Sequence, residues 1–284
     1  MTINSKPLLK GLRHPIKGLT HWLWTPLSGA TIEQQLIQEN PANLKRVQSI
    51  DLFTWVLYLV IMVGVSAIPI LQKARTLSIV LCYTVLALGL AWIKLDISNS
   101  VSRLGFIKRP LKARKWLKAA GYSFIFIAGE LIFALYTLTH LTKGVSSLNT
   151  MYIISLLKKQ WLYLIYVVII SPILEEMVFR QSIFNSLVRW VSRWQHVHLE
   201  HRWLLIVAAF FTGWIFAVMH GDLKVIAYMT MSIYLQWIYW REKDIKMNIL
   251  THGFINLFTV MILLLTILVW VRKGPNGPFL LDIK

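Results

Sequence analysis

Long apolar runs, separated by short polar or basic stretches, dominate the chain between residues 52 and 271. Most of these runs have about the 20 residues that an α-helix needs to cross the hydrocarbon core of a bilayer. No series of short alternating segments, which a membrane β-barrel would need, is present in the sequence. The pattern therefore predicts an all-α fold, a polytopic bundle of about seven transmembrane helices. The expected limits of these helices are 52–71, 77–95, 117–141, 161–190, 203–219, 223–240 and 245–271.

The run at 161–190 differs from the others because it carries Glu175, Glu176 and Arg180 in an apolar setting. Charged groups at membrane depth are costly, so they are usually paired and usually functional. In a helix Glu176 and Arg180 share a face, in the order that favours an ion pair, whereas Glu175 lies about 100° round from Glu176. We therefore expect the arginine to hold one carboxylate and to leave the other free for chemistry. Pro172 lacks a backbone donor and predicts a kink near this group.

Composition supports a membrane protein and limits its partners. The chain is 56% hydrophobic and 15% charged, whereas about a quarter of the residues of a soluble domain are charged. The net charge of +18 comes from lysines and arginines that cluster between the apolar runs. This clustering is typical of cytoplasmic loops and argues against a nucleic-acid partner. The single cysteine, Cys82, excludes an intramolecular disulfide and a cysteine-based metal cluster.

The distribution of basic residues also predicts a topology. The connection at 97–118 is strongly basic and contains no acidic residue, so we expect it in the cytoplasm. The N-terminus and the loops near 190–202 and 241–246 then lie inside as well, and the C-terminus lies outside. Residues 1–50 lack the continuous apolar segment of a cleavable signal peptide, so we expect a cytoplasmic, partly interfacial basic tail.

Two more polar clusters lie within or at the ends of apolar runs. Phe216 precedes His220 by four residues, and His252 precedes Asn256 by the same spacing, so each pair shares a helix face. A histidine at a helix end is more often a hydrogen-bonded interior residue than a catalytic one, so neither cluster is informative alone. A Glu pair alone is equally compatible with a proton relay in a transporter. The three clusters in this order are much more specific.

Together the clusters form the motif set Glu175-Glu176-x-x-x-Arg180, Phe216-x-x-x-His220 and His252-x-x-x-Asn256. This set resembles, without substitution, the motifs of the CAAX-protease and bacteriocin-processing family (CPBP, also called Abi) of intramembrane proteases. The resemblance covers about residues 160–260. It implies endopeptidase activity within the membrane, on prenylated proteins in some members and on peptides or bacteriocin precursors in others. Several bacterial members are linked to self-immunity against bacteriocins.

Hydropathy and the resemblance together divide the chain into four expected parts. These are a cytoplasmic or interfacial basic tail at 1–50, accessory transmembrane helices at 51–150, a CAAX-protease-like catalytic transmembrane core at 151–271 and a C-terminal tail at 272–284. The basic loops and the lack of eukaryotic targeting signals favour a multi-pass protein of a bacterial plasma membrane. The expected partners are membrane lipid and a peptide or membrane-protein substrate, while the sequence leaves the substrate and the oligomeric state open.

The residue types suggest a mechanism that resembles the one proposed for the family. Glu175 would act as the general base toward a water molecule that His220 holds. His252 and Asn256 would donate hydrogen bonds to the tetrahedral oxyanion. The supporting residues would be Glu176, Arg180 and Phe216, of which the first two fix the helix and the position of the general base.

A zinc mechanism competes with this metal-free mechanism. One glutamate and two histidines with a water in the fourth position are a known catalytic zinc set, and Glu175, His220 and His252 would supply it here. The His-Glu-x-x-His pattern of many zinc proteases is absent from the sequence. We therefore favour the metal-free version and keep zinc as the alternative cofactor.

Hydropathy creates one difficulty for either mechanism. It puts His220 at the outer end of its helix and His252 at the inner end of the last one, about 30 Å of hydrocarbon apart. The two can meet only if helices are kinked, tilted or shifted. Broken helices are tolerated around a cavity within the membrane, and Gly213, Gly221 and Gly253 would permit such a change.

Two other functions fit parts of the sequence. The first is a bacteriocin-immunity or scaffold protein of the same family whose catalysis is dispensable. The second is a proton-coupled transporter that uses Glu130, Glu175 and Glu176. The sequence has no internal inverted repeat of the kind that many transporters show, which argues against transport.

Overall fold

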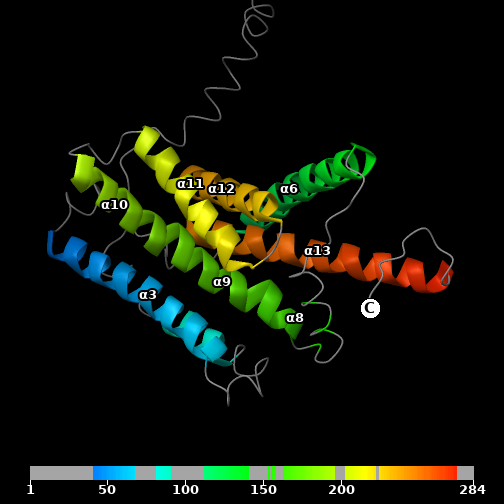
Figure 1. Cartoon of the computed structure of the whole chain (residues 1–284), viewed down its shortest axis with the longest axis horizontal. Helices are drawn as coiled ribbons and strands as arrows, with labels where there is room; N and C mark the ends of the chain where they lie inside the picture. Colours follow the sequence, from blue (N-terminus) through cyan, green and yellow to red (C-terminus); the bar gives the residue numbers. More distant parts are fainter. Residues whose placement is uncertain are drawn as a thin grey trace, which may run out of the picture.

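The computed structural model of the chain describes a defined set of residues. They are 41–67, 81–90, 112–140, 161, 163–195, 202–221, 224–242 and 244–273, with the single positions 153, 155 and 157. Every secondary-structure element among them is a helix (Figure 1), so the predicted all-α class is confirmed for this part of the chain. The N-terminal tail before residue 41, most of the basic connection at 97–118 and the tail after residue 273 lie outside the described residues.

The helices follow the predicted apolar runs. Residues 81–90 form one helix. The labelled elements are α3 (Pro41–Ala67), α6 (Ala113–His140), α8 (Tyr163–Ile165), η2 (Tyr166–Ile170), α9 (Ser171–Glu175), η3 (Glu176–Ile183), α10 (Phe184–Gln195), α11 (Arg202–Met219), α12 (Val225–Glu242) and α13 (Ile245–Lys273). Two segments of the described chain, Ala113–Tyr136 and Ile245–Leu265, are long and apolar enough to cross a membrane by themselves. The count of about seven spans therefore stays a prediction.

The elements from α8 to α10 form one helical stretch without a break, and two parts of it are π-helical. The Ser171 N–H donates to the Tyr166 carbonyl, five residues back, and the residues that bound each part keep right-handed helical angles. Pro172 has no N–H to donate, and the wider π turn just before it accommodates the proline within the helix. Because π turns change the angular position of the residues that follow, they re-aim side chains and often occur at functional sites.

This helical stretch lies at the centre of the molecule (Figure 1). Helix α3 packs along η3 and α10 on one side, α11 and α13 contact the stretch from the other side, and α6 packs on α13. The core between these helices is apolar, with Leu174, Met177 and Phe179 from the central stretch meeting Phe216 and Leu235. Helices that start far apart in the chain therefore converge around residues 171–180.

The outward faces of the helices are also apolar. Phe124, Ile132 and Leu135 on α6 are more than 60% exposed, and Phe210 and Trp214 on α11 are about half exposed. Soluble monomers rarely present apolar surface on this scale, whereas a lipid environment favours it. This surface and the two long apolar helices support a membrane protein.

Ion pairs tie the start of α6 to the connection between α12 and α13. Lys115 Nζ lies 2.7 Å from Asp244 Oδ2, and Lys118 Nζ lies 2.5 Å from Glu242 Oε1. The Tyr122 hydroxyl donates to the same Glu242 oxygen at 2.8 Å. These contacts put the start of α6 and the connection between α12 and α13 at one end of the bundle. Their position on the cytoplasmic side of the membrane stays a prediction.

A glycine lets α13 approach the central stretch closely. A Cβ atom at Gly253 would lie 2.7 Å from the Val168 carbonyl oxygen, too close for any other residue without a shift of the backbone. One turn further along α13, Asn256 Nδ2 donates to the Val167 carbonyl at 2.8 Å. This close contact brings one face of α13 against α9 and η3.

Candidate active site

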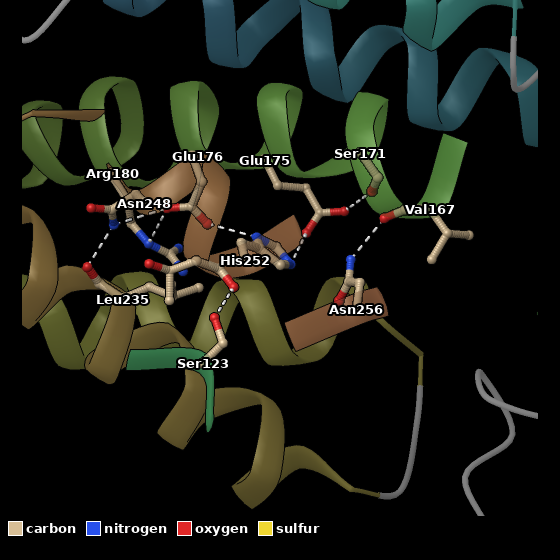
Figure 2. Close-up of polar contacts among 11 residues, drawn as sticks. Ser123, Val167, Ser171, Glu175, Glu176, Arg180, Leu235, Asn248, His252 and Asn256 are labelled. Atoms are coloured by element: carbon tan, nitrogen blue, oxygen red, sulfur yellow. Dashed lines mark hydrogen bonds and ion pairs between the residues drawn. The ribbon is translucent and has the colours of Figure 1, made fainter. Parts of the chain in front are cut away.

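The two adjacent glutamates of the central stretch have different surroundings (Figure 2). Glu176 is completely buried. Its Oε1 accepts a hydrogen bond from His252 Nδ1 at 2.8 Å, and its Oε2 accepts one from Asn248 Nδ2 at 3.2 Å. Arg180 Nε lies 3.1 Å from Oε2, so the ion pair that the spacing predicted is present. Both oxygens of Glu176 are therefore occupied by protein groups, so this carboxylate has a structural role.

Arg180 is also completely buried, and its charge is balanced inside the protein. Its guanidinium lies over the Phe216 ring, 5.1 Å from the ring centroid, a geometry in which a cation is attracted to the aromatic face. The same ring lies 4.4 Å from the His220 ring and 6.3 Å from the His252 ring, centroid to centroid. Phe216 thus packs against the arginine and both histidines.

Glu175 faces the other way. The Ser171 hydroxyl donates a short hydrogen bond to its Oε1. Its Oε2 lies 3.8 Å from His252 Nε2, which is too far for a hydrogen bond. Among the described residues, this oxygen has no hydrogen-bond partner. The side chain is 15% exposed and lines a cavity of about 520 Å³. Of the two glutamates, Glu175 is therefore the one with a carboxylate oxygen available for chemistry.

The cavity brings together all four residues that the sequence suggested as catalytic: Glu175, His220, His252 and Asn256. The separation of about 30 Å that hydropathy gave for the two histidines is therefore wrong. His252 lies seven residues inside α13, well past its start at Ile245, and the His220 ring packs back on Phe216. The depth of a side chain in the bundle depends on where its helix starts and on how that helix packs. Hydropathy reports neither of these.

Hydrogen bonds orient both imidazole rings. His252 Nδ1 faces the Glu176 carboxylate, and His220 Nδ1 faces the Phe216 carbonyl at 2.7 Å. An ionised carboxylate and a carbonyl only accept, so each Nδ1 carries a proton. The Nε2 atom of each ring is then left for other partners, and that of His252 faces Glu175. The His220 ring also stacks on Tyr228 at 4.2 Å.

Some of the hydrogen-bond donors that the sequence assigned to the oxyanion are already bonded to other groups of the protein. His252 Nδ1 is used by Glu176, and one N–H of Asn256 is used by the Val167 carbonyl. Asn256 keeps a second amide N–H. Both residues line the cavity, but each also fixes α13 against the central stretch.

Sequence reasoning missed two contacts of the candidate site, namely those of Ser171 with Glu175 and of Asn248 with Glu176. Ser171 lies four residues before Glu175, and Asn248 lies four residues before His252. This spacing puts each of them on the same helix face as its neighbour and was a usable signal. Asn248 Nδ2 also donates to the Leu235 carbonyl at 2.6 Å, so it links α12 to the Glu176 carboxylate.

The positions of Glu175, His220 and His252 determine whether they could bind a zinc ion together. A catalytic zinc needs three protein ligands that converge on one point. Among the residues that the structure describes, no group of three His, Cys, Asp or Glu side chains is close enough to hold a metal ion. Within the zinc set, Glu175 Oε2 and His252 Nε2 are 3.8 Å apart. The side chains as placed do not form a three-ligand zinc site.

Comparisons with known proteins agree with this picture. A family model described as type II CAAX prenyl endopeptidase Rce1-like matches residues 157–258. The "Membrane-embedded CAAX protease MroQ" of Staphylococcus aureus (strain USA300) is 28% identical over 201 residues, 70% of this chain and 78% of that protein. The "Putative membrane peptidase YdiL" of Bacillus subtilis (strain 168) is 30% identical over 119 residues, 42% of this chain and 44% of that protein. No solved structure matches the chain significantly.

Proposed function

Because residues 157–258 belong to the CAAX-protease and bacteriocin-processing family of membrane proteases, we propose that this chain is an intramembrane endopeptidase of the metal-free, glutamate type. It hydrolyses peptide bonds of membrane-associated peptides or proteins. The observation that carries the proposal is the Glu175 Oε2 atom, a buried carboxylate oxygen without a partner. Glu175 belongs to the wall of a cavity that also contains two imidazoles and an amide.

The first step is the activation of water. A polar gap of 3.8 Å between Glu175 Oε2 and His252 Nε2 is of the kind that a bridging water often occupies. Glu175 takes a proton from this water as general base, and the water oxygen attacks the carbonyl carbon of the substrate. His220 holds the water from the opposite side. The product of this step is a tetrahedral intermediate with a negative oxygen, and Asn256 donates its remaining N–H to that oxygen.

The second step breaks the peptide bond. The intermediate collapses, the C–N bond breaks, and the departing amine takes the proton that Glu175 received, directly or through His220. The products are a free carboxyl group and a free amine, and Glu175 regains its charge. Ser171 supports this cycle because its hydrogen bond fixes one oxygen of Glu175 and leaves the other, which lies 3.8 Å from His252 Nε2, for the water.

Glu176 and Arg180 support the reaction by holding His252 in position. The buried Glu176 carboxylate holds His252 by Nδ1 and so directs Nε2 toward Glu175, while Arg180 balances the buried charge. A carboxylate that orients a histidine in this way is a common supporting arrangement in hydrolases. Phe216 supports the same group by packing under the arginine.

The proposed setting is a bacterial plasma membrane. Residues 51–150 would supply accessory helices and 151–271 the catalytic core of a bundle of about seven spans, with the N-terminus in the cytoplasm. The half-open cavity with its tyrosine and leucine walls suits an apolar substrate segment that enters from the lipid phase.

The test compares membrane peptides from cells that carry wild-type protein or Glu175→Gln. We expect peptides that accumulate with wild type to disappear with Glu175→Gln, since the amide cannot take up the proton. Glu130→Gln is a matched control, because Glu130 lines the same cavity from α6, and we expect it to keep the wild-type profile. A peptide profile that is the same for wild type and Glu175→Gln would argue strongly against a protease. Flux driven by a pH gradient without cleavage would instead favour transport.

Metal content distinguishes the two versions of the chemistry. We expect the purified wild-type protein to contain no stoichiometric zinc and to keep its Glu175-dependent cleavage in the presence of a chelator. Zinc at one equivalent, lost in His252→Ala, would favour the zinc alternative. Bacteriocin immunity that survives Glu175→Gln would favour the scaffold alternative.

A further inference from the structure

A row of tyrosine rings forms one wall of the cavity. Tyr58 of α3 lies 6.1 Å from Tyr83, Tyr83 stacks on Tyr166 at 6.1 Å, and Tyr166 stacks on Tyr163 at 5.1 Å, all between ring centroids. All four rings line the cavity that contains Glu175. Tyr58 and Tyr83 precede the segment that the family model matches, so the accessory helices contribute directly to this wall.

Two contacts fix the position of Tyr58. At the first, Arg189 Nη1 lies 3.2 Å from Asp51 Oδ2, and the Ser182 hydroxyl donates to Asp51 Oδ1 at 3.3 Å. At the second, two helical turns further along α3, the Tyr58 ring meets Phe179 edge to face at 5.9 Å. Because residues seven apart share a helix face, these contacts fix both the rotation and the register of α3 against η3 and α10.

The Tyr58 phenol is near the reacting group. Tyr58 and Glu175 line the same cavity, and the Tyr58 ring packs on Phe179, which lies four residues after Glu175 on the same helical stretch. Within the part of the chain that the structure describes, its hydroxyl makes no hydrogen bond. Tyr58 lines the cavity, so a substrate there would supply a partner.

The proposed protease mechanism lacks donors at the oxyanion. His252 Nδ1 and His220 Nδ1 are used by other groups of the protein, and neutral imidazoles present only acceptors at Nε2. One N–H of Asn256 is used by Val167, which leaves one. Oxyanion sites generally aim more than one donor at the developing charge.

We propose that Tyr58 is a further catalytic residue, whose hydroxyl donates a hydrogen bond to the carbonyl oxygen of the bond being cleaved. The inference rests on the proposed endopeptidase function and deepens it. The proton stays on the phenol throughout, so the step adds no covalent change. The hydrogen bond strengthens as negative charge develops on the oxygen. An accessory helix outside the matched segment thereby becomes part of the active site.

The experiment uses full-length protein in membrane vesicles and compares wild type with Tyr58→Phe, which keeps the ring and removes the hydroxyl. The probe is the set of vesicle peptides whose accumulation requires Glu175, and the readout is their initial rate of formation. We expect a loss of about 100-fold, the effect typical of removing one oxyanion donor. Tyr239→Phe is the matched control, because Tyr239 is equally buried but lies away from the cavity beside Gln181. We expect near wild-type rates from it.

The outcomes separate this inference from the function it rests on. A slow Tyr58→Phe with wild-type abundance and thermal stability supports the proposal. A wild-type rate for Tyr58→Phe, in vesicles where Glu175→Gln is inactive, overturns the role of Tyr58 and leaves the protease intact. A Tyr58→Phe protein that fails to accumulate assigns the hydroxyl to folding and also overturns the proposal. Glu175→Gln vesicles that form the same peptides as wild type overturn the protease itself.

Discussion

The buried charges of Glu176 and Arg180 determine much of the chemistry at the residue scale. Removing both from water is costly, and the cost is offset only when each group keeps partners in the interior. Glu176 has three such partners, in Arg180, Asn248 and His252. Glu175, by contrast, has one oxygen bonded to Ser171 and one without a partner. Adjacent residues of the same type thus differ, because the Glu176 carboxylate is fully engaged and the Glu175 carboxylate keeps one oxygen without a hydrogen bond among the described residues.

Glu176→Gln should destabilise the protein, because it leaves the Arg180 charge buried without a counterion. Breaking a buried pair from one side typically costs about 3–5 kcal/mol, and the glutamine amide keeps some hydrogen bonds, so we expect about 3 kcal/mol. The double variant Glu176→Gln/Arg180→Met should recover part of this loss because no charge remains. Unfolding of the purified protein by denaturant measures both.

Glu130→Gln is the control for this comparison, because its carboxylate is only partly buried in α6. We expect it to change stability by less than about 0.5 kcal/mol. A single variant Glu176→Gln that is as stable as wild type would contradict the structural role given to the ion pair.

At the element scale, the geometry of the helices determines where the side chains of the site point. The π-helical parts η2 and η3 flank α9 and keep the chain helical past Pro172. Helix α13 then packs closely enough on η2 for Asn256 to reach the Val167 carbonyl. That approach requires a glycine at position 253, where a Cβ would meet the Val168 carbonyl oxygen. The positions of His252 and Asn256 in the cavity depend on this one contact between elements.

Gly253→Ala should shift α13 away from the central stretch. The methyl group would lie 2.7 Å from a backbone oxygen, which cannot rotate away, and overpacking of this kind costs about 1–3 kcal/mol. We expect lower stability and at least a tenfold loss in the rate of Glu175-dependent cleavage, because a small displacement of catalytic groups has large effects.

Gly129→Ala on α6 is the matched control, since nothing lies within 4 Å of its added methyl group. Alanine also has the higher helix propensity, so we expect equal or slightly greater stability and unchanged cleavage. Equal behaviour of the two variants would indicate that the close approach of α13 is not needed.

At the scale of the whole molecule, helices from the two halves of the chain enclose one cavity. Helix α3 and residues 81–90 contribute Tyr58 and Tyr83, and α6 contributes Glu130, to walls completed by α11, α12 and α13. The α6 start is tied to the α12–α13 connection by Lys115 and Lys118. These ion pairs define one end of the bundle.

This arrangement predicts which residues face each compartment. In a Cys82→Ser background, Arg114→Cys and Trp194→Cys should react with a membrane-impermeant thiol reagent only in inverted vesicles, because the basic ends of α6 and α10 are expected in the cytoplasm. Lys224→Cys should react only from the opposite side. All three side chains are exposed in the structure, so burial does not prevent labelling. Labelling of Arg114→Cys and Lys224→Cys from the same side would contradict the topology.

Sequence alone determined the features that depend on local spacing. The apolar runs gave the helices, because hydropathy and length are properties of a continuous segment. The ion pair of Glu176 with Arg180 followed from a spacing of four residues, and the same spacing would have revealed Ser171 and Asn248. The motif residues could be named from their types and order in the sequence. In the structure, Glu175, His220, His252 and Asn256 all line the same cavity.

Only the tertiary structure decided how these groups meet. His252 lies between two carboxylates that are 76 and 77 positions away in the chain, and Asn256 reaches a carbonyl 89 residues before it. Such contacts depend on helix depth, on the π turns and on the room that Gly253 leaves, none of which periodicity reports. The inclusion of Tyr58 in the wall likewise follows from the docking of α3 through Asp51. Local periodicity fixes each helix and its faces, whereas the partners of a face are fixed by packing between distant segments.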